Sequence, residues 1–511
     1  MKNIFLLFAF YCIALGPIQG QTVNYSEHIA PIIYKHCTSC HRPGEIAPFS
    51  LTNYDQVKSW SGLITYVTEI KYMPPWKADP AFQHYQKENY LEDSEIQLIA
   101  DWVEQGTPQG NPALEPPLPV FPNGSQIGNP DLVLSFAQSY LHQGTGVDEY
   151  RYFVIPTGLT EDKDLVALEI RPGNKKIMHH CLVWGDTTGT AASDDAKTLE
   201  YGYESGSSTN LDEINNQLPG YVPGQKPVLY TNGIASKLYK GTDLKLQVHY
   251  APTNADETDS TSINLFFAKQ PATRYVQNYV MLPLPNILTN GPFIIFPNTV
   301  KEFHGQIPIP EDVSMLGIAP HMHKLGQHWL VYAVTPNNDT INLVKINEWD
   351  FNWQGAYYFK QLIKIPKNSI LHAYAEYDNT SANVNNPNDP PKAISWGEKT
   401  SDEMYYLPLL YLNYQPGDEN IVFDETTAIE DLPFYQVNDQ LYPVAPNPAS
   451  GMVQVGFTLR NGQSISLTLL NMDGKVVQQI VKKQFHQAGL HTRQLDVSQL
   501  PSGMYALVLE S

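Results

Sequence analysis

Hydrophobic residues recur with two different periods along the chain, and the change of period divides it into regions. From about residue 130 to 425 the apolar residues form short runs, rich in β-branched and aromatic side chains and broken by Pro, Asn, Asp and Gly. Examples are DLVALEIRP, DLKLQVHYAP, SINLFFAKQ, HWLVYAVTP and SILHAYAEYDN. Such runs are typical of the strands of β-sandwiches, so the middle of the chain is predicted to be all-β.

The first region, residues 22–115, has a helical period instead. The stretches DQVKSWSGLITYVTEI and LEDSEIQLIADWVEQG carry apolar residues at helical spacing, and a Pro-rich loop precedes the first of them. The second stretch has Asp93 or Ser94 as its N-cap and Gly106 as its stop. The pattern predicts a small domain of helices joined by loops.

The segment KHCTSCHRPG in this region contains a C-x-x-C-H motif formed by Cys37, Cys40 and His41. This spacing is the attachment site of a covalent haem c, with the imidazole as one iron ligand. A zinc knuckle or a redox dithiol is the alternative, but a zinc site needs two more ligands nearby and the region has no further cysteine. The motif predicts one haem in the chain.

Met73 is predicted as the second axial ligand of that iron, because the two prolines after it can hold a rigid loop over the haem. A methionine paired with a histidine raises the reduction potential, which suits electron transfer. His36 and His84 are the other candidates. The stretches CTSCHRPGEIAPFSL, MPPW and DWVEQGTPQG resemble the all-α cytochrome c domains that precede copper monooxygenase domains in some bacterial proteins.

A second group of metal-binding residue types is spread over the strand-rich middle. Its members stand in KIMHHCLVWG, LKLQVHYAP, IAPHMHKLGQHW and TSDEM, and they are His179, His180, His249, His321, His323 and Met404. An isolated strand histidine is more often structural than a ligand, and a methionine before tyrosines is normally a core residue. His321 and His323 share one face if their segment is extended.

The order HH, QVHY, PHMHKLG and TSDEM resembles the ligand order of the copper type II ascorbate-dependent monooxygenases, a family that includes peptidylglycine α-hydroxylating monooxygenase and dopamine β-monooxygenase. The resemblance implies two consecutive jelly-roll-like β-sandwiches, residues 130–275 and 276–425, with one copper on each across a solvent-filled cleft. It assigns an electron-transferring copper to His179, His180 and His249. It assigns the catalytic, oxygen-binding copper to His321, His323 and Met404.

Two features depart from that family. Its animal members are rich in disulfides, whereas this chain has four cysteines, one of them in the leader and two in the haem motif. The remaining one, Cys181, is interpreted as a buried thiol, with an extra copper ligand as the alternative. Ala319 stands where peptide-hydroxylating members have an arginine, which argues against a peptidylglycine substrate. Zinc is the alternative metal for an imidazole cluster, but a thioether favours Cu(I).

The two ends of the chain and one linker complete the predicted organisation. Residues 1–20 have a lysine near the start and an apolar run, which predicts a secretory signal peptide. Residues 116–129 form a Pro-rich linker. Residues 438–511, with PNPASG, NMDGKVV and LPSGMYAL, resemble the C-terminal sorting domain of the type IX secretion system and predict a small β-sandwich. An exported protein at the cell surface or outside the cell is expected.

The net charge of the chain excludes one class of binding partner. The chain of 511 residues has 32 basic and 52 acidic residues, a net charge of −20. This balance argues against nucleic-acid binding, which needs a basic face.

The patterns along the chain together predict a multidomain fold class: a small all-α cytochrome c domain, two all-β copper sandwiches and a small C-terminal β-sandwich.

The expected function is hydroxylation of a C–H bond of a small organic substrate by O2, with two coppers and with electrons fed by haem c from an external donor. Three alternatives stay open. The first is a non-catalytic electron-transfer or copper-binding protein, the second a copper oxidase that reduces O2 without hydroxylation, and the third a zinc hydrolase.

Overall fold

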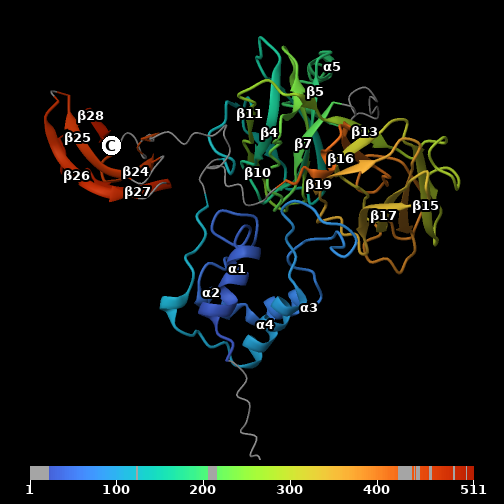
Figure 1. Cartoon of the computed structure of the whole chain (residues 1–511), viewed down its shortest axis with the longest axis horizontal. Helices are drawn as coiled ribbons and strands as arrows, with labels where there is room; N and C mark the ends of the chain where they lie inside the picture. The colour runs from blue at the N-terminus through green and yellow to red at the C-terminus, as the bar shows by residue number, and fades with distance from the viewer. Residues whose placement is uncertain are drawn as a thin grey trace, which may run out of the picture. The chain divides into compact units, whose positions relative to one another are not determined.

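The computed structural model divides the chain into two compact units, one up to Asp424 and one from Glu425 onward (Figure 1). The described residues are 22–121, 125–204, 216–423, 440–441, 444, 449–459, 463–472, 474–486, 489–501 and 503–510. The expected signal peptide, residues 1–20, lies outside them. No helix among the described residues combines the length and hydrophobicity that crossing a membrane requires.

The first β-sandwich of unit 1 consists of two five-stranded sheets. One has the order β1 (Leu132–Ser135), β11 (Ser262–Phe267), β4 (Lys163–Arg171), β8 (Ile234–Leu238) and β12 (Arg274–Tyr275). The other has the order β6 (Tyr203–Glu204), β3 (Glu149–Pro156), β9 (Asp243–Tyr250), β5 (Met178–Asp186) and β7 (Gln217–Tyr221). The pair β2 (Tyr140–His142) and β10 (Glu257–Asp259) and helix α5 (Thr190–Asp195) flank them. Phe153, Leu168, Val248 and Leu265 are fully buried in the shared core.

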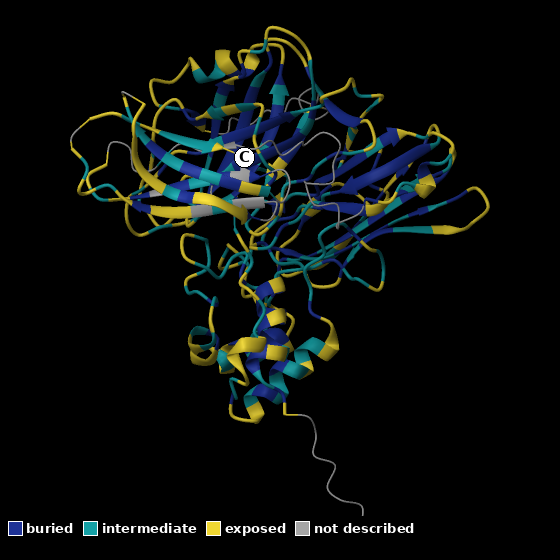
Figure 2. Cartoon of the chain, turned by 60° about the vertical axis from the view of Figure 1, so that its left-hand side comes forward, coloured by how far each residue is buried: buried dark blue, intermediate teal, exposed yellow. Residues whose placement is uncertain are grey.

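The second β-sandwich of unit 1 consists of two four-stranded sheets. One has the order β13 (Gln277–Met281), β22 (Leu407–Asn413), β16 (Val313–Ile318) and β19 (Tyr357–Ile365). The other has the order β15 (Val300–Pro308), β20 (Ile370–Asp378), β17 (Gly326–Val334) and β18 (Thr340–Ile346), and β14 (Ile294–Ile295) pairs with β21 (Ile394–Ser395). Along β20, buried residues alternate with partly exposed ones, and Figure 2 shows buried residues in dark blue along the strands of the sandwiches.

The N-terminal region is made of short helices and long irregular stretches. Its helices are η1 (Tyr25–Ile29), α1 (Ala30–His36), α2 (Tyr54–Ser59), α3 (Ser61–Glu69), α4 (Asp93–Glu104) and η2 (Pro112–Leu114). The longest of them, α4, has 12 residues. The predicted fold class is therefore wrong: the chain is mostly β-sheet, with 40% strand and 12% helix, and no sizeable all-α domain is evident at the N-terminus of the described chain.

One reason for this difference is that part of the Pro-rich segment 74–90 packs in the second sandwich, while Asn89 near its end bonds with His36 of α1. Ala78 and Tyr85 belong to the core of the second sandwich and form bridges with Ile346 and Phe359. The Tyr85 hydroxyl donates to the carbonyl of Leu343 at 2.7 Å. Proline-rich sequence cannot continue a helix, and the extended segment instead completes a sheet core far along the chain.

Unit 2 is a small β-sandwich of two three-stranded sheets. One has the order β23 (Gln440–Leu441), β24 (Met452–Leu459) and β27 (Gly489–Asp496), and the other has β26 (Val476–His486), β25 (Gln463–Asn471) and β28 (Tyr505–Glu510). Val455, Phe457, Ile465 and Leu467 are fully buried in its core. The β25–β26 pair runs antiparallel around Gly474, whose φ is +76°.

A buried ion pair joins the last strand of the first sandwich to the end of the second. The Arg274 guanidinium contacts both carboxylate oxygens of Asp418, at 2.6 and 2.7 Å, and the Ser314 hydroxyl donates to the same carboxylate at 2.5 Å. Burial by itself raises the pKa of Asp418, but the hydrogen bonds from Arg274 and Ser314 outweigh it and lower that pKa.

We expect Asp418→Ala to lower the free energy of unfolding by about 3–5 kcal/mol, because it leaves a buried guanidinium without its partner. The stabilisation by Asp418 should be complete above the usual carboxyl pKa of about 3.9 and should be lost as the pH falls through the lowered value. Urea unfolding at pH 7 and below pH 4 measures both effects. Glu161→Ala, on the exposed Glu161–Lys163 pair, is the control and should leave the midpoint unchanged.

Candidate functional site

Three histidines of the first sandwich converge on one point. His179 and His180 lie on β5 and His249 on β9, and one ring nitrogen from each lies within 4.8 Å of the others. A register shift between Met178 and His180 interrupts the β5–β9 ladder. Such a bulge lets two consecutive side chains approach the same side of a sheet, so the Nδ1 atoms of His179 and His180 come within 3.2 Å.

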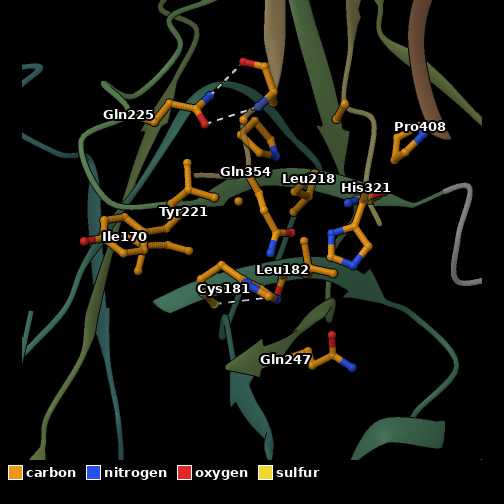
Figure 3. Close-up of a pocket in the computed structure, with 18 of the residues that line it drawn as sticks. Ile170, Cys181, Leu182, Leu218, Tyr221, Gln225, Gln247, His321, Gln354 and Pro408 are labelled. Carbon is orange, nitrogen blue, oxygen red and sulfur yellow. Dashed lines mark hydrogen bonds between the residues drawn. The ribbon is translucent and has the colours of Figure 1, made fainter. Parts of the chain in front are cut away.

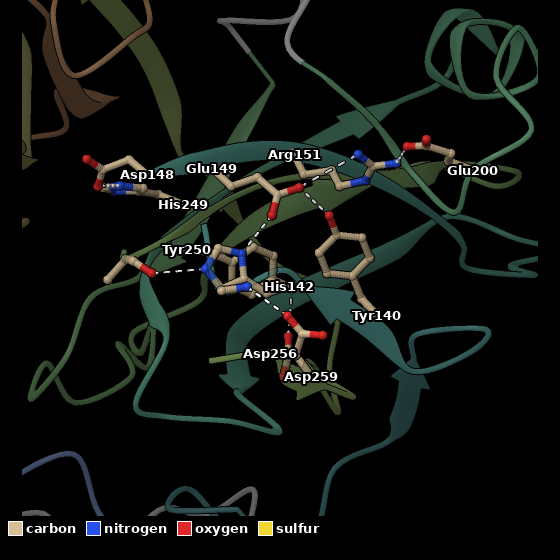
Figure 4. A network of polar contacts seen from close by, with 12 residues as sticks. Tyr140, His142, Asp148, Glu149, Arg151, Glu200, His249, Tyr250, Asp256 and Asp259 are labelled. Atoms are coloured by element: carbon tan, nitrogen blue, oxygen red, sulfur yellow. Dashed lines mark hydrogen bonds and ion pairs between the residues drawn. The ribbon is translucent and has the colours of Figure 1, made fainter. Parts of the chain in front are cut away.

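The His249 imidazole is oriented by two neighbours that the sequence pattern did not single out. The Asp148 carboxylate accepts a hydrogen bond from His249 Nε2 at 2.7 Å, as Figure 4 shows. Tyr150 stacks on the same ring, with centroids 4.2 Å apart. Because a carboxylate only accepts, the hydrogen is on Nε2 and the Nδ1 lone pair remains free. That Nδ1 atom is buried and has no hydrogen-bond partner among the described residues.

The triad is arranged to bind a cation with neutral ligands. Burial, reinforced by the nearby His249, lowers the pKa of His179 to about 3. Burial also lowers the pKa of His180 well below its usual value. The imidazoles are therefore neutral at physiological pH, which is the form that coordinates metals. Three neutral nitrogens with an orphaned, buried Nδ1 fit a copper or zinc ion.

His321 and His323 lie on the connection between β16 and β17. Their rings are 5.2 Å apart and perpendicular. His321 forms a backbone bridge with Tyr406. His323 Nδ1 donates to the carbonyl of Asp402 at 3.1 Å, which leaves Nε2 as the ligand atom. Burial lowers the pKa of His323 to about 4.

The two histidine sets adjoin each other inside unit 1. The rings of His180 and His321 have centroids 6.0 Å apart. Phe351 stands beside both sets, 5.4 Å from His179 and 5.8 Å from His323. His180 and His323 are only 4% and 1% exposed. The solvent-filled cleft between two copper sites stays a prediction.

Met404 precedes β22 and lines the same cavity as His180, His321 and His323. Figure 3 shows His321 among the residues that line this cavity. The cavity has about 1690 Å³ of empty space, including its open mouth. Met404 also packs on the small apolar cluster of Val280, Leu282, Trp396 and Tyr406. The structure thus places Met404 where both a ligand role and a packing role are available to it.

The rest of the cavity wall combines aliphatic and proline residues with several aromatic and amide side chains. Gln247, on the same face of β9 as His249, donates to the Tyr152 hydroxyl at 2.8 Å. Gln225 bonds with the backbone of Ala356 across the cavity, as dashed lines mark in Figure 3. Such a wall accommodates a small organic molecule beside both histidine sets.

The C-x-x-C-H motif begins at the end of α1. Neither Cys37 nor Cys40 forms a disulfide, and burial raises the pKa of Cys37 to about 12. His41 Nδ1 donates to the carbonyl of Phe49 at 3.1 Å, which leaves Nε2 for a metal. Two free thiols and one oriented imidazole fit covalent haem attachment.

The motif lies against strand β7 of the first sandwich. A Cβ placed on Gly224 would be 3.4 Å from the Cys40 sulfur. Burial, followed by the nearby Cys40, raises the pKa of Tyr221. Tyr221 pairs across the β5–β7 ladder with Cys181, which follows His180 in the chain. The motif and the triad are thus separated by a tyrosine side chain and one strand spacing, which is about 4.8 Å.

Met73 does not line the same space as that motif. It lies in a separate cavity of about 670 Å³ of empty space, together with Trp76, Tyr90 and Ile96, and none of Cys37, Cys40 and His41 lines it. Of the other two candidates for the axial position, His36 bonds with Asn89 at 2.8 Å and His84 is paired with Glu88.

Several site residues had no signal in the sequence. Asp148 and Phe351 touch the histidines from loops and belong to no recognised motif. Glu403 stands in the TSDEM segment, but its contact with the histidine segment had no signal there. Burial raises the pKa of Glu403 to about 8, and backbone N–H groups oppose the shift. Cys181 is buried and its thiol donates to the carbonyl of Leu182 at 3.6 Å.

Comparisons with known proteins add one firm assignment. Residues 443–511 match the family described as the secretion system C-terminal sorting domain. Unit 2 is a type IX sorting domain. This domain directs the chain to the cell surface or the exterior and implies contact with the type IX secretion machinery. Its six strands form the small sandwich described above.

Outside the sorting domain the comparisons carry no argument. No curated protein matches the chain. The VP2 subviral particle of infectious bursal disease virus is 9% identical with a TM-score of 0.16, over 59% of this chain and 76% of that one. A DUF4785 family protein from Legionella pneumophila is 12% identical with a TM-score of 0.11, over 76% and 92% of the two chains. Scores this low define no common fold.

Proposed function

We propose that unit 1 is a copper-dependent monooxygenase that hydroxylates a C–H bond of a small organic substrate, with a covalent haem as its electron inlet. The observation that carries the proposal is that the triad adjoins, through His180, a cavity that His321, His323 and Met404 of the other sandwich also line. The resemblance in ligand order to the copper type II monooxygenases supports the same assignment. Ala319 beside the cavity argues against a peptide carboxylate as the recognised group.

In this proposal His179, His180 and His249 hold one copper, and His321, His323 and Met404 hold the other. Bound copper supplies the one-electron steps by which O2, two electrons and two protons convert R–H into R–OH and water. Asp148 and the Asp402 carbonyl accept hydrogen bonds from His249 Nε2 and His323 Nδ1, so the other ring nitrogen of each histidine is the one that would hold copper. The aromatic wall holds the substrate and keeps bulk water from the reacting carbon.

Cys37 and Cys40 would hold the haem through two thioethers, and His41 would provide one iron ligand. When bound, the haem supplies electrons one at a time. The position of Cys40 against Gly224 supports the entry of electrons from the haem to the copper of the histidine triad. The haem proposal requires no all-α domain. It leaves the second iron ligand unassigned, because Met73 lies in a cavity that no residue of the motif lines.

A copper oxidase that reduces O2 without hydroxylation is the second candidate, favoured by the 6.0 Å approach of His180 and His321. Labelled oxygen separates the two. Under ¹⁸O2 with a reductant and a panel of small phenylalkyl amines and amides, the monooxygenase places one label in a product, whereas the oxidase places both in water. A non-catalytic copper protein consumes no O2, and a zinc hydrolase contains no copper.

The metal count tests the division of ligands. Protein from a haem-maturing host, loaded with copper, should contain two coppers and one covalent haem per chain. The double variant His321→Ala with His323→Ala should lose one copper and keep the haem spectrum, because the triad retains its three nitrogens. The matched control is the double variant His304→Ala with His372→Ala. These two side chains lie on β15 and β20 of the second sandwich and are hydrogen-bonded to each other at 3.0 Å. This variant should keep both coppers. Loss of both coppers from the first variant would show that the ligands are divided wrongly.

A further inference from the structure

Glu403 is a fully buried carboxylate directly beside the proposed oxygen-binding site. It has 0% exposure and precedes Met404 in the chain. Its Oε2 accepts the backbone N–H of His323 at 2.9 Å and the backbone N–H of Met404 at 3.0 Å. Its Oε1 accepts the N–H of Leu325 at 2.7 Å. One side chain therefore ties the methionine segment to the histidine turn.

The two segments that Glu403 joins are 80 residues apart in sequence. They come from different connections, one after β16 and the other before β22. His323 and Met404 share a single acceptor oxygen, so the separation of their backbones is fixed by two hydrogen bonds that meet at one atom. Metal sites tolerate displacements of only about 0.2 Å in ligand distance. Two hydrogen bonds to one oxygen of Glu403 can keep both ligand segments within that limit.

Further contacts keep the same segments in register. The carbonyl of Asp402 accepts from His323 Nδ1 at 3.1 Å, and the Tyr377 hydroxyl donates to the carbonyl of Met404 at 2.8 Å. Tyr406 exchanges both backbone hydrogen bonds with His321 at 2.8 and 3.2 Å. In each case the bond leaves the metal-facing atoms of the histidine or methionine free.

The chemistry of the residue supports a positioning role. Buried N–H groups need acceptors, and both oxygens of the Glu403 carboxyl group accept them, whereas an amide replaces one oxygen with a donor. Burying a carboxylate is costly unless hydrogen bonds compensate. Packing alone would be served by an apolar residue at this position.

We infer that Glu403 is a positioning residue that holds the Met404 thioether and the His323 imidazole in one fixed arrangement. This inference rests on the proposed function, since it assigns Glu403 to the second copper site. Its effect on the metal is indirect, through the backbone of the two ligand segments.

Glu403→Gln in the full-length, copper-loaded protein is the test. Cu(I) affinity at the second site should fall about 10-fold to 100-fold, the range for residues that orient metal ligands. The sulfur contribution to the copper X-ray absorption spectrum should weaken, while the triad copper stays bound and reports a folded sandwich. Glu403→Asp keeps a carboxylate and should recover part of the affinity, and it replaces the glutamine variant if that one does not fold.

A double-mutant cycle separates positioning from general stability. In a Met404→Ile background, Glu403→Gln should cause little additional loss of Cu(I) affinity, because the ligand it positions is already gone from that background. The control is Glu169→Gln, another buried carboxylate that accepts a backbone N–H, from Gln126 at 2.7 Å. That variant should leave the second copper unchanged.

The results of these experiments distinguish a failure of the inference from a failure of the proposed function. Wild-type protein that holds only one copper contradicts the proposed function and this inference together. Two coppers in the wild type, with a glutamine variant of unchanged affinity and unchanged sulfur signal, contradict the inference alone. Additive losses of Cu(I) affinity in the double-mutant cycle also contradict the inference alone.

Discussion

The Met404→Ile variant is expected to fold normally and to lose nearly all turnover. Met404 is partly buried against Val280, Leu282 and Tyr406, and isoleucine fills a similar volume, so the cost in unfolding free energy should stay below about 1.5 kcal/mol. The sulfur is the part that matters for chemistry, because a thioether favours Cu(I), the form that reacts with O2. Turnover should fall by more than about 100-fold, the upper limit for residues that only support ligands.

Two measurements check this result. Steady-state product formation gives the turnover, and a competition titration with a Cu(I) chelator gives the affinity of the second site. Met281→Ile is the matched control, since Met281 is fully buried in the core of the second sandwich and should keep its activity. Full activity of Met404→Ile would make Met404 a packing residue and would leave the second site without its third ligand.

The double variant Cys37→Ala with Cys40→Ala is expected to bind both coppers and yet to turn over slowly with a protein electron donor. Without a covalent haem the electrons must arrive by collision at the copper site, and losing a tethered partner typically costs roughly 100-fold or more. A small diffusible reductant that enters the cavity should restore turnover. The substitutions are small and leave the contacts of Ala78 and Tyr85 with the second sandwich in place.

Stopped-flow mixing provides the direct readout. Reduced wild-type protein mixed with O2 and substrate should show haem oxidation at the same rate as product formation. Cys181→Ala removes the third buried thiol and should keep both the haem and the donor dependence. If haem oxidation lags far behind turnover, or the donor dependence of the double variant is unchanged, the haem is not the inlet, while the copper assignment would survive.

Local patterns in the sequence were informative wherever a short segment sets its own geometry. The C-x-x-C-H spacing identifies two thiols and an imidazole that the structure leaves unbridged and oriented. The family resemblance, and not a local pattern, grouped the HH pair with the strand histidine His249, and these three residues converge. Periodicity distinguishes the face of a strand, so it placed Gln247 and His249 together.

Contacts between distant segments were not accessible in the same way. Periodicity indicates which side of a strand is buried but not which partner buries it. It therefore identified neither Asp148 nor Phe351, nor the contact that Glu403 of TSDEM makes with the His323 segment. The same limit explains the wrong fold class. Tyr85 belongs by sequence to the helical region, yet it is buried in a β-sandwich core assembled from strands that follow it by more than 200 residues.

That placement of Tyr85 has a consequence for how the protein is made. Its hydrogen bond to Leu343 closes a loop of 258 residues, and contacts of such long range form late because loop closure is entropically costly. During synthesis from the N-terminus the segment around Ala78 and Tyr85 has no core to enter until β18 and β19 exist. The haem-motif region therefore cannot complete its packing as the first folded module, and its final assembly waits for the second sandwich.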